Sequence, residues 1–294
     1  VPEYFESEKT NLLEAIRSLI NDKRDWADSR LLRALCDGEA YAVPRLGDEE
    51  TVDKLQALKV YTQSRDLIST APLEIIYSGS ADLERVKQAL AAAFATLPRE
   101  EVRVISTAAP HVCRESVQHV EDVLDVTQGK LGMGFSCGSD DMPALLMGNT
   151  LFGGSSNSKL FLNVREKLSL CYYASSLYHR QKGLITVSSG IEFQNYQRAY
   201  DEIMAQLEAV QKGELEDWEL EGARSTLLNS YATVGDSQGK LENFYLGQAA
   251  TGQHETPADL ARAIQDMTAE RICRAMSTVK LDTVYFLKGK EAEA

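Results

Sequence analysis

The sequence lacks several features that would place a chain in a specialised class. No run of about eighteen apolar residues occurs, so a membrane-spanning helix is not expected. The few cysteines form no C-x-x-C pair, which argues against a zinc knuckle or a redox dithiol, and we interpret them as buried thiols in a reducing compartment. Positive charge is also scarce. The 31 Lys and Arg residues stand against 44 Asp and Glu, a net charge of -13, which disfavours nucleic acid and anionic membranes as partners.

What remains is the composition of a folded, soluble chain. Hydrophobic residues make up 44% and charged residues 26%, close to the averages of globular proteins. The 294 residues exceed the length at which single cores usually stop growing, so two domains are expected. The first residues resemble neither a signal peptide nor a translation start, and we expect further natural sequence upstream of Val1. A cytoplasmic location is predicted, with a targeting signal in that upstream sequence left open.

Hydrophobic periodicity divides the chain into two regions joined by a linker. The first region is rich in helices, predicted over 5–20, 26–36, 49–64 and 81–97, with one short β-branched strand over 73–78. Residues 99–116 show no clear periodicity and are predicted to link the two regions. The expected domains are therefore 1–98, the C-terminal part of a first domain, and 117–294, a complete second one.

The second region combines clustered strands with helices. Strands over 117–126 and 130–137, on either side of Gln128-Gly129, are predicted to begin a meander. A hairpin over 171–189 and a last strand over 283–287 complete the sheet. Helices are predicted over 142–152, 158–167, 196–211, 215–233, 239–251 and 258–277. This pattern predicts an α+β fold, with an antiparallel sheet packed against a layer of helices, and disfavours a doubly wound parallel sheet.

Self-contained catalytic motifs are absent from the printed sequence. Neither H-E-x-x-H nor H-x-x-E-H occurs, and we interpret the four histidines as solvated or structural side chains. The nucleophile elbow, the Walker loop and the dinucleotide fingerprint are missing as well. The run from Gly153 to Ser158 could suggest a phosphate cradle, but it has no P-loop lysine. We interpret its glycines as the end of one helix and its serines as the cap of the next.

The same run opens a longer string that carries a family resemblance. Leu151-Phe152-Gly153-Gly154-Ser155-Ser156-Asn157-Ser158-Lys159-Leu160-Phe161-Leu162-Asn163-Val164-Arg165-Glu166-Lys167, continuing to Leu170-Cys171-Tyr172, resembles the second homologous domain of the pitrilysin/insulinase family of inverted-motif zinc metallopeptidases. The resemblance covers residues 117–287, and 5–97 is similar to the latter part of the family's first domain. It implies pitrilysin-like domains and places Arg165 and Tyr172 where the family holds the substrate backbone near the zinc.

The chemistry of these two side chains suits that role. Guanidinium and phenol can both donate hydrogen bonds to a peptide carbonyl or to a developing oxyanion without losing a proton. A purely structural alternative stays open, in which Arg165 caps a helix C-terminus and Tyr172 fills one face of a strand.

The resemblance also implies a zinc site, and the sequence departs from it. The family's H-x-x-E-H string would lie upstream of Val1, and aligning Glu8-Lys9 with the start of the next ligand helix puts Ala15 at the third ligand position. Alanine cannot bind zinc, and Glu14 is rotated by about 100° from that position on a helix. In an alternative alignment Glu8 is the ligand and Glu14 an outer carboxylate. The leading expectation is that this chain has no metal ligand, no catalytic residue and no cofactor of its own.

Three functional hypotheses follow from the resemblance. The leading one is a non-catalytic, peptidase-like protein that binds peptides or unfolded polypeptides in a cleft, at a free strand edge, or that forms a homodimer or a heterodimer with an active homologue. The second is an active zinc endopeptidase whose motif lies upstream. The third is a structural subunit with an extensive apolar partner surface.

Overall fold

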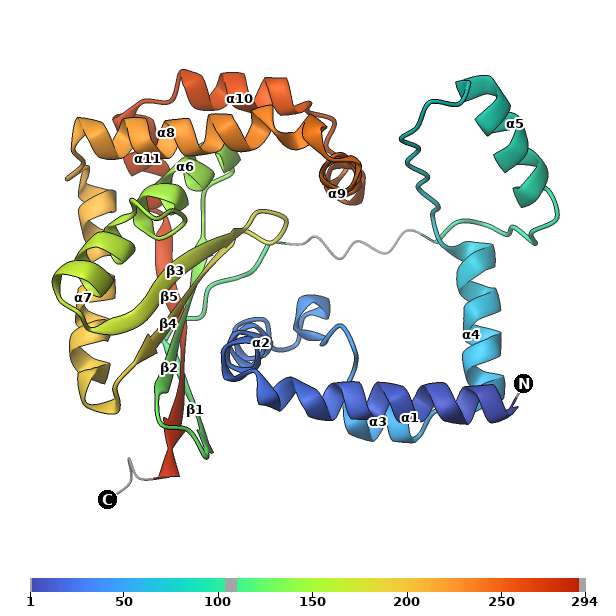
Figure 1. Ribbon diagram of the computed structural model, residues 1–294, viewed down its shortest axis with the longest axis horizontal. Helices are drawn as coiled ribbons and strands as arrows, with labels where there is room; N and C mark the ends of the chain where they lie inside the picture. The colour runs from blue at the N-terminus through green and yellow to red at the C-terminus, as the bar shows by residue number, and fades with distance from the viewer. Residues whose placement is uncertain (1, 104–109, 291–294) are drawn as a thin grey trace. The chain divides into compact units, whose positions relative to one another are not determined.

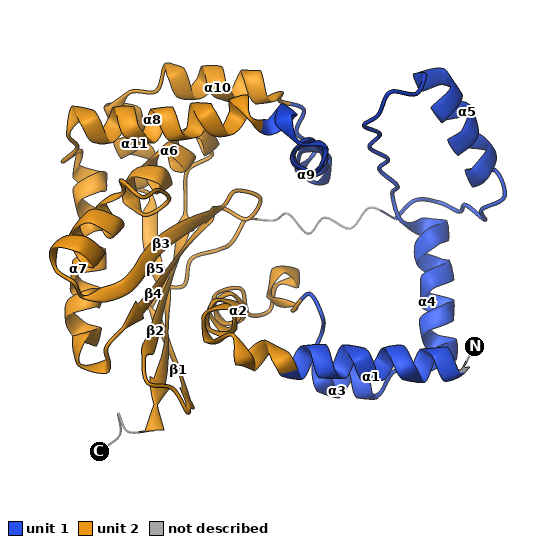
Figure 2. Ribbon diagram, viewed as in Figure 1, with its two compact units in different colours: residues 1–17, 45–107, 234–254 blue, residues 18–44, 108–233, 255–294 orange. Residues whose placement is uncertain are grey.

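The computed structural model describes residues 2–103 and 110–290, and its contacts divide the chain into two compact units (Figures 1 and 2). Unit 1 is drawn from Val1–Arg17, Arg45–Thr107 and Val234–His254. Unit 2 is drawn from Ser18–Pro44, Ala108–Thr233 and Glu255–Ala294. The middle of the predicted linker, 104–109, lies outside the described residues. None of the described helices is both long and apolar enough to cross a membrane.

Unit 1 consists of helices and irregular segments. Its helices are α1 (Pro2–Ser18, followed by the 3-10 turn η1, Leu19–Asn21), α3 (Glu49–Asp53), α4 (Ala57–Thr70), α5 (Leu83–Phe94) and α9 (Gln238–Thr251). The helix predicted over 49–64 is therefore two helices, because Gln56 takes an extended conformation between them.

The strand predicted over 73–78 is wrong. That segment is irregular, and the described part of unit 1 contains no strand with which it could pair. Its β-branched and aromatic side chains are half exposed instead, including Ile75 at 50%. A β-branched run alone therefore did not make a strand, since strand propensity depends on a partner and a face to pack against.

Unit 2 is built on one five-stranded sheet in the order β1-β5-β2-β4-β3. Its strands are β1 (Gln118–Leu124), β2 (Gly129–Cys137), β3 (Cys171–His179), β4 (Leu184–Ile191) and β5 (Val279–Gly289). β1 runs parallel to β5, and the other three pairs are antiparallel. The predicted hairpin of β3 and β4 is confirmed, with Gly183 in the left-handed conformation at its turn. The predicted meander is wrong at its start, because β5 lies between β1 and β2.

Helices cover both faces of this sheet (Figure 1). One face meets α6 (Met142–Phe152), the π-helix η3 (Leu160–Lys167) and α7 (Tyr196–Lys212). The same core continues into α8 (Asp217–Ala232), α10 (Pro257–Gln265) and α11 (Ala269–Met276), which pack on α6. The helix predicted over 258–277 is thus two helices. Along β2, Met133 and Phe135 face this main core, while the alternate residues Gly132 and Gly134 face α2 (Lys23–Leu35).

Glycine lets α2 approach the sheet closely. A Cβ atom added at Gly134 would lie 2.7 Å from a methyl carbon of Leu35, and one at Gly132 would lie 3.1 Å from a methyl carbon of Leu31. Leu31 is 1% exposed and packs with Tyr285 and Leu287 of β5 in a second, smaller core. Residues 18–44, expected in the first domain, thus pack on the sheet of unit 2. The predicted domains 1–98 and 117–294 rest on the family resemblance, whereas the two units are defined by contacts. The predicted domain boundaries therefore stay a prediction.

Two polar anchors fix α2 to the strands. Near its middle, Arg30 donates to both carboxylate oxygens of Asp122, at 2.7 and 3.2 Å, and the Tyr285 hydroxyl donates to the same carboxylate at 2.8 Å. At its C-terminal end, the guanidinium of Arg114 donates to the carbonyls of Ala34 and Leu35, and at 2.5 Å to the buried carboxylate of Asp282. The second anchor satisfies helix carbonyls that have no partner within the helix.

We expect the free energy of unfolding to fall when the pH drops below about 4. Burial alone would raise the pKa of Asp122, but the hydrogen bonds from Arg30 and Tyr285 hold it below its ordinary value of 3.8. The paired Arg271 lowers the pKa of Asp141 in the same way. Because these carboxyls take up protons more readily in the unfolded chain, their stabilisation is complete above the unfolded pKa and is lost as the pH falls through the folded one. Urea unfolding between pH 2 and 7 measures this, and Asp122→Asn should flatten the curve. An identical acid dependence in that variant would contradict the assignment.

Candidate functional site

Arg165 and Tyr172 meet at one open depression on the surface of unit 2, with a volume of about 410 Å³. It is lined by Arg165, Glu166, Ser169, Leu170, Cys171, Tyr172, Glu192 and Asn195. The two predicted residues come from consecutive elements, η3 and β3, and Glu192 follows β4, the neighbouring strand. The structure therefore brings the two residues together, while their role in binding a substrate stays a prediction.

Arg165 lies on a π-helix. The sequence predicts an α-helix over 158–167, but residues 160–167 form the wider π turn, a rare conformation that often occurs at functional sites. The guanidinium lies 4.6 Å from the centre of the Phe161 ring, and one of its nitrogens is 3.5 Å from Glu166. Among the described residues it donates no hydrogen bond to a helix carbonyl, but it lies in the last turn of η3, so the capping alternative stays open through its charge.

Tyr172 owes its exposure to an irregularity in β3. Cys171 pairs with Ile191 and Tyr173 with the adjacent Gly190, which leaves Tyr172 as the extra residue of a β-bulge. Just before it, Ser169 has a φ of 50°, in the left-handed region that a non-glycine residue seldom adopts. The Tyr172 side chain is 52% exposed and does not fill a strand face. Its hydroxyl donates to Glu192, and this hydrogen bond raises the pKa of Tyr172.

The depression has the chemistry of a binding site. Arg165 offers donors for peptide carbonyls, and Tyr172 can donate to one in exchange for its hydrogen bond to Glu192, whose carboxylate can then accept from a peptide N–H. Cys171 is its one thiol, and burial raises the pKa of that thiol, which keeps it in the less reactive protonated form. The lining residues include no histidine, and the carboxylates of Glu166 and Glu192 are the basic groups among them.

β3 is an edge strand, but part of its edge is already occupied. The backbone N–H of Ser176 donates to the carbonyl of Gly153, at 2.9 Å. A Cβ atom at Gly153 would lie 2.7 Å from that nitrogen, so only glycine permits this approach. Gly153 also ends α6, and the Ser158 hydroxyl accepts from the N–H of Phe161 in the next helix, which confirms the interpretation of this run as helix caps. The free edge expected from the sequence is thus restricted to the part of β3 nearer Tyr172.

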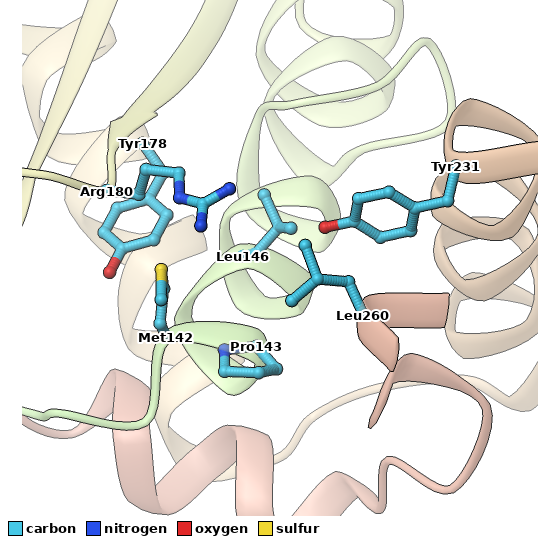
Figure 3. Close-up of a pocket in the computed structure, with 7 residues that line it drawn as sticks. All are labelled: Met142, Pro143, Leu146, Tyr178, Arg180, Tyr231 and Leu260. Carbon is cyan, nitrogen blue, oxygen red and sulfur yellow. The ribbon is translucent and has the colours of Figure 1, made fainter. Parts of the chain in front are cut away.

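A second, smaller pocket lies at the other end of β3 (Figure 3). Met142, Pro143, Leu146, Tyr178, Arg180, Tyr231 and Leu260 line it. Arg180 and Tyr231 enter from opposite sides, and their polar ends are turned toward Leu146 between them (Figure 3). Its central space is about 40 Å³, room for the end of one apolar side chain rather than for a whole small molecule.

The described residues do not form the zinc site that the resemblance implies. α1 carries Glu8 and Glu14, both exposed, and neither histidine nor cysteine, while Ala15 has no donor atom to offer. Across residues 2–103 and 110–290, the group of three side chains able to hold a metal is Cys36, Glu39 and His111, none of which belongs to α1. The alternative in which Glu8 is a ligand stays a prediction, and no catalytic step through zinc is derived for this chain.

Sequence comparisons identify the family. The family model for the peptidase M16 inactive domain matches residues 65–227. The probable inactive metalloprotease YmfF of Bacillus subtilis is 35% identical over 296 residues, which cover 98% of this chain and 68% of YmfF. The chain belongs to the peptidase M16 family. The resemblance to the pitrilysin/insulinase metallopeptidases is confirmed, and the M16 chain is a peptidase-like homologue that fits the non-catalytic hypothesis.

Two further relatives extend the comparison. The uncharacterized zinc protease YmxG of Bacillus subtilis is 23% identical over 281 residues, covering 91% of the M16 chain and 66% of YmxG. A crystal structure of a conserved protein from Enterococcus faecalis V583 matches with a TM-score of 0.89 and 26% identity, over 99% of the M16 chain and 69% of that protein. The predicted α+β, pitrilysin-like fold is confirmed. The chain spans about two thirds of the length of each of these relatives.

Proposed function

We propose that this chain is a non-catalytic M16 homologue that binds peptides or unfolded polypeptides at the depression beside β3. The observation that carries the proposal is the convergence of Arg165, Tyr172 and Glu192 from three successive elements. Two donors and one acceptor match the carbonyls and N–H groups of an extended backbone. Side-chain identity enters little into such contacts, which favours unfolded segments over one folded partner.

Partnership with a homologous chain, as a homodimer or a heterodimer with an active peptidase, is the second part of the proposal. Unit 1 exposes large apolar side chains, including Leu58 at 75%, Tyr61 at 59%, Leu67 at 59% and Leu83 at 55%. Apolar surface of this kind is typical of protein–protein contacts. It supports a chain that works against a partner surface, and the cytoplasmic location stays a prediction.

Replacing both donors should weaken peptide binding. For Arg165→Ala combined with Tyr172→Phe we expect a loss of affinity of about 10- to 100-fold, because one charged and one neutral hydrogen bond are removed. Fluorescence anisotropy with dye-labelled casein, an unfolded polypeptide, measures this. The matched control combines Arg274→Ala with Tyr245→Phe, which alters exposed residues outside the depression. Full retention of casein binding by the Arg165/Tyr172 variant would overturn the site.

Absence of catalysis is tested separately. The chain should leave the same casein uncleaved during long incubation with added zinc. The reason is that its described residues do not provide the family's zinc ligands together with a general base. Cleavage that requires zinc and stops on addition of a chelator would overturn the non-catalytic part of the proposal, and would favour the active endopeptidase. Peptide binding without cleavage supports both parts for these 294 residues, and the same incubation with the natural protein, any upstream sequence included, distinguishes a non-catalytic homologue from the active endopeptidase.

A further inference from the structure

A buried group of metal-binding side chains lies in unit 2, in a place that the peptide proposal does not use. Cys36 ends α2, Glu39 follows it in the next turn, and His111 belongs to the segment that leads toward β1. One ligand atom from each lies within 4.8 Å of the other two. We propose that Cys36, Glu39 and His111 bind a divalent ion of the zinc class. This inference is independent of the proposed function.

The donor set suits zinc. Thiolate, imidazole and carboxylate are the three ligand types that zinc takes in proteins, at about 2.0–2.3 Å. Ligand atoms around one ion then lie roughly 3–4 Å from one another, so the observed spacing needs only small adjustments. Cys36 is fully buried and Glu39 is partly exposed, so an ion could enter from the side of Glu39. On binding, Cys36 acts as thiolate and its proton passes to solvent.

The histidine is held as metal-binding histidines usually are. The His111 side chain is 3% exposed, its Nδ1 lies 2.6 Å from Glu39 and its Nε2 lies 3.2 Å from the carboxylate of Asp282. When an ion binds, Nε2 keeps its proton and donates to Asp282, while the Nδ1 lone pair binds the ion in place of the hydrogen bond to Glu39. A carboxylate behind the histidine is the common supporting arrangement at metal sites, because it fixes the ring and its tautomer. Arg114 fixes that carboxylate in turn.

A lysine provides the positive charge that an ion would bring. Lys182, in the turn between β3 and β4, is 4% exposed and pairs with Glu39. Burial raises the pKa of the Cys36 thiol to about 11, and the nearby Lys182 offsets part of that rise. An entering ion must therefore displace the ammonium from Glu39, which the flexible four-carbon side chain of lysine allows. This competition predicts that removing the lysine strengthens metal binding, a result that a merely structural cluster would not give.

Cobalt(II) provides the probe, because thiolate-bound cobalt absorbs strongly in the near ultraviolet. Titration of the 294-residue chain, prepared without a histidine tag, should produce the thiolate band, and added zinc should abolish it by competition. Cys36→Ser should remove the band, whereas the control Cys137→Ser, at a partly buried cysteine outside the group, should keep it. Lys182→Gln should bind cobalt about tenfold more tightly, equivalent to one ion pair of about 1.4 kcal/mol.

Several results would overturn the site. Absence of the thiolate band from the wild-type chain at every cobalt concentration would overturn the site by itself, before any variant is measured. If the band persists in Cys36→Ser, it comes from another cysteine. Weaker cobalt binding by a folded Lys182→Gln variant would contradict the proposed competition between Lys182 and the ion for Glu39. Far-ultraviolet circular dichroism establishes folding of each variant. If Cys36→Ser fails to fold, His111→Gln is the substitute variant. It should lose the band while its circular dichroism stays unchanged, and a band retained in that variant would overturn the site.

Discussion

Asp282→Asn should lower the free energy of unfolding of unit 2 by about 3–5 kcal/mol, the cost of breaking a buried ion pair from one side. The Asp282 side chain is 0% exposed. It accepts from the backbone and the guanidinium of Arg114, at 2.8 and 2.5 Å, and from Thr283. Asparagine keeps the shape but presents an NH₂ group or a weaker acceptor to Arg114. The guanidinium that holds the end of α2 is then left without a compensating charge.

Urea unfolding followed by tryptophan fluorescence measures this loss. The chain has two tryptophans, Trp26 and Trp218, and both belong to unit 2, so the signal reports that unit. Glu270→Gln is the matched control, because Glu270 forms an i,i+4 pair with Arg274 in which both side chains are largely exposed. Such pairs contribute little, and we expect a change below about 0.5 kcal/mol. Equal effects of the two substitutions would show that Asp282 is not a buried anchor.

Leu31→Ala should destabilise unit 2 by about 2–5 kcal/mol, the usual cost of truncating a fully buried leucine. Leu31 fills the space above Gly132, and its other neighbours are the buried side chains of β5. The glycine cannot expand to fill the cavity left behind, so the loss should fall in the upper part of that range.

The comparison is with Leu58→Ala, the same substitution at a leucine that is 75% exposed in unit 1. Its effect on unfolding should stay below about 0.5 kcal/mol. Trp26 lies on the same helix as Leu31 and packs into the same small core, so its fluorescence follows α2 directly. A loss at Leu31 no larger than at Leu58 would mean that α2 does not cover the sheet in solution.

Local sequence patterns predicted most elements but not their pairing. The helix expected over 142–152 has those bounds in the structure, and the hairpin of β3 and β4 follows its glycine turn. The order of strands could not be read in the same way. β1 and β2 are separated by a short turn, yet β5, which comes about 150 residues later in the chain, lies between them. That choice depends on side chains from distant segments that share one core, such as Leu131 and Phe286.

The candidate site was predicted through resemblance rather than through periodicity. The residue types of Cys171, Tyr172 and Tyr173 do not predict a bulge, because one extra residue shifts the alternation of inward and outward side chains by only one position. Glu192 was missed for a related reason: it is one acidic residue among 44, and the pairing of β3 with β4 is what carries it to Tyr172. The group around Cys36 and His111 was missed because His111 lies 72 residues beyond Glu39, and Cys36 with Glu39 alone forms no recognised metal-binding spacing.

The position of β5 inside the sheet has a consequence for biosynthesis. β5 follows every other described strand and helix of unit 2 along the chain, yet it is the strand that joins β1 to β2. While β5 is still inside the ribosome exit tunnel, β1 lacks the strand with which it pairs and the sheet cannot be completed. The sheet of unit 2 must therefore wait until β5 has left the ribosome, and during that delay its apolar strands are exposed to chaperones and to aggregation.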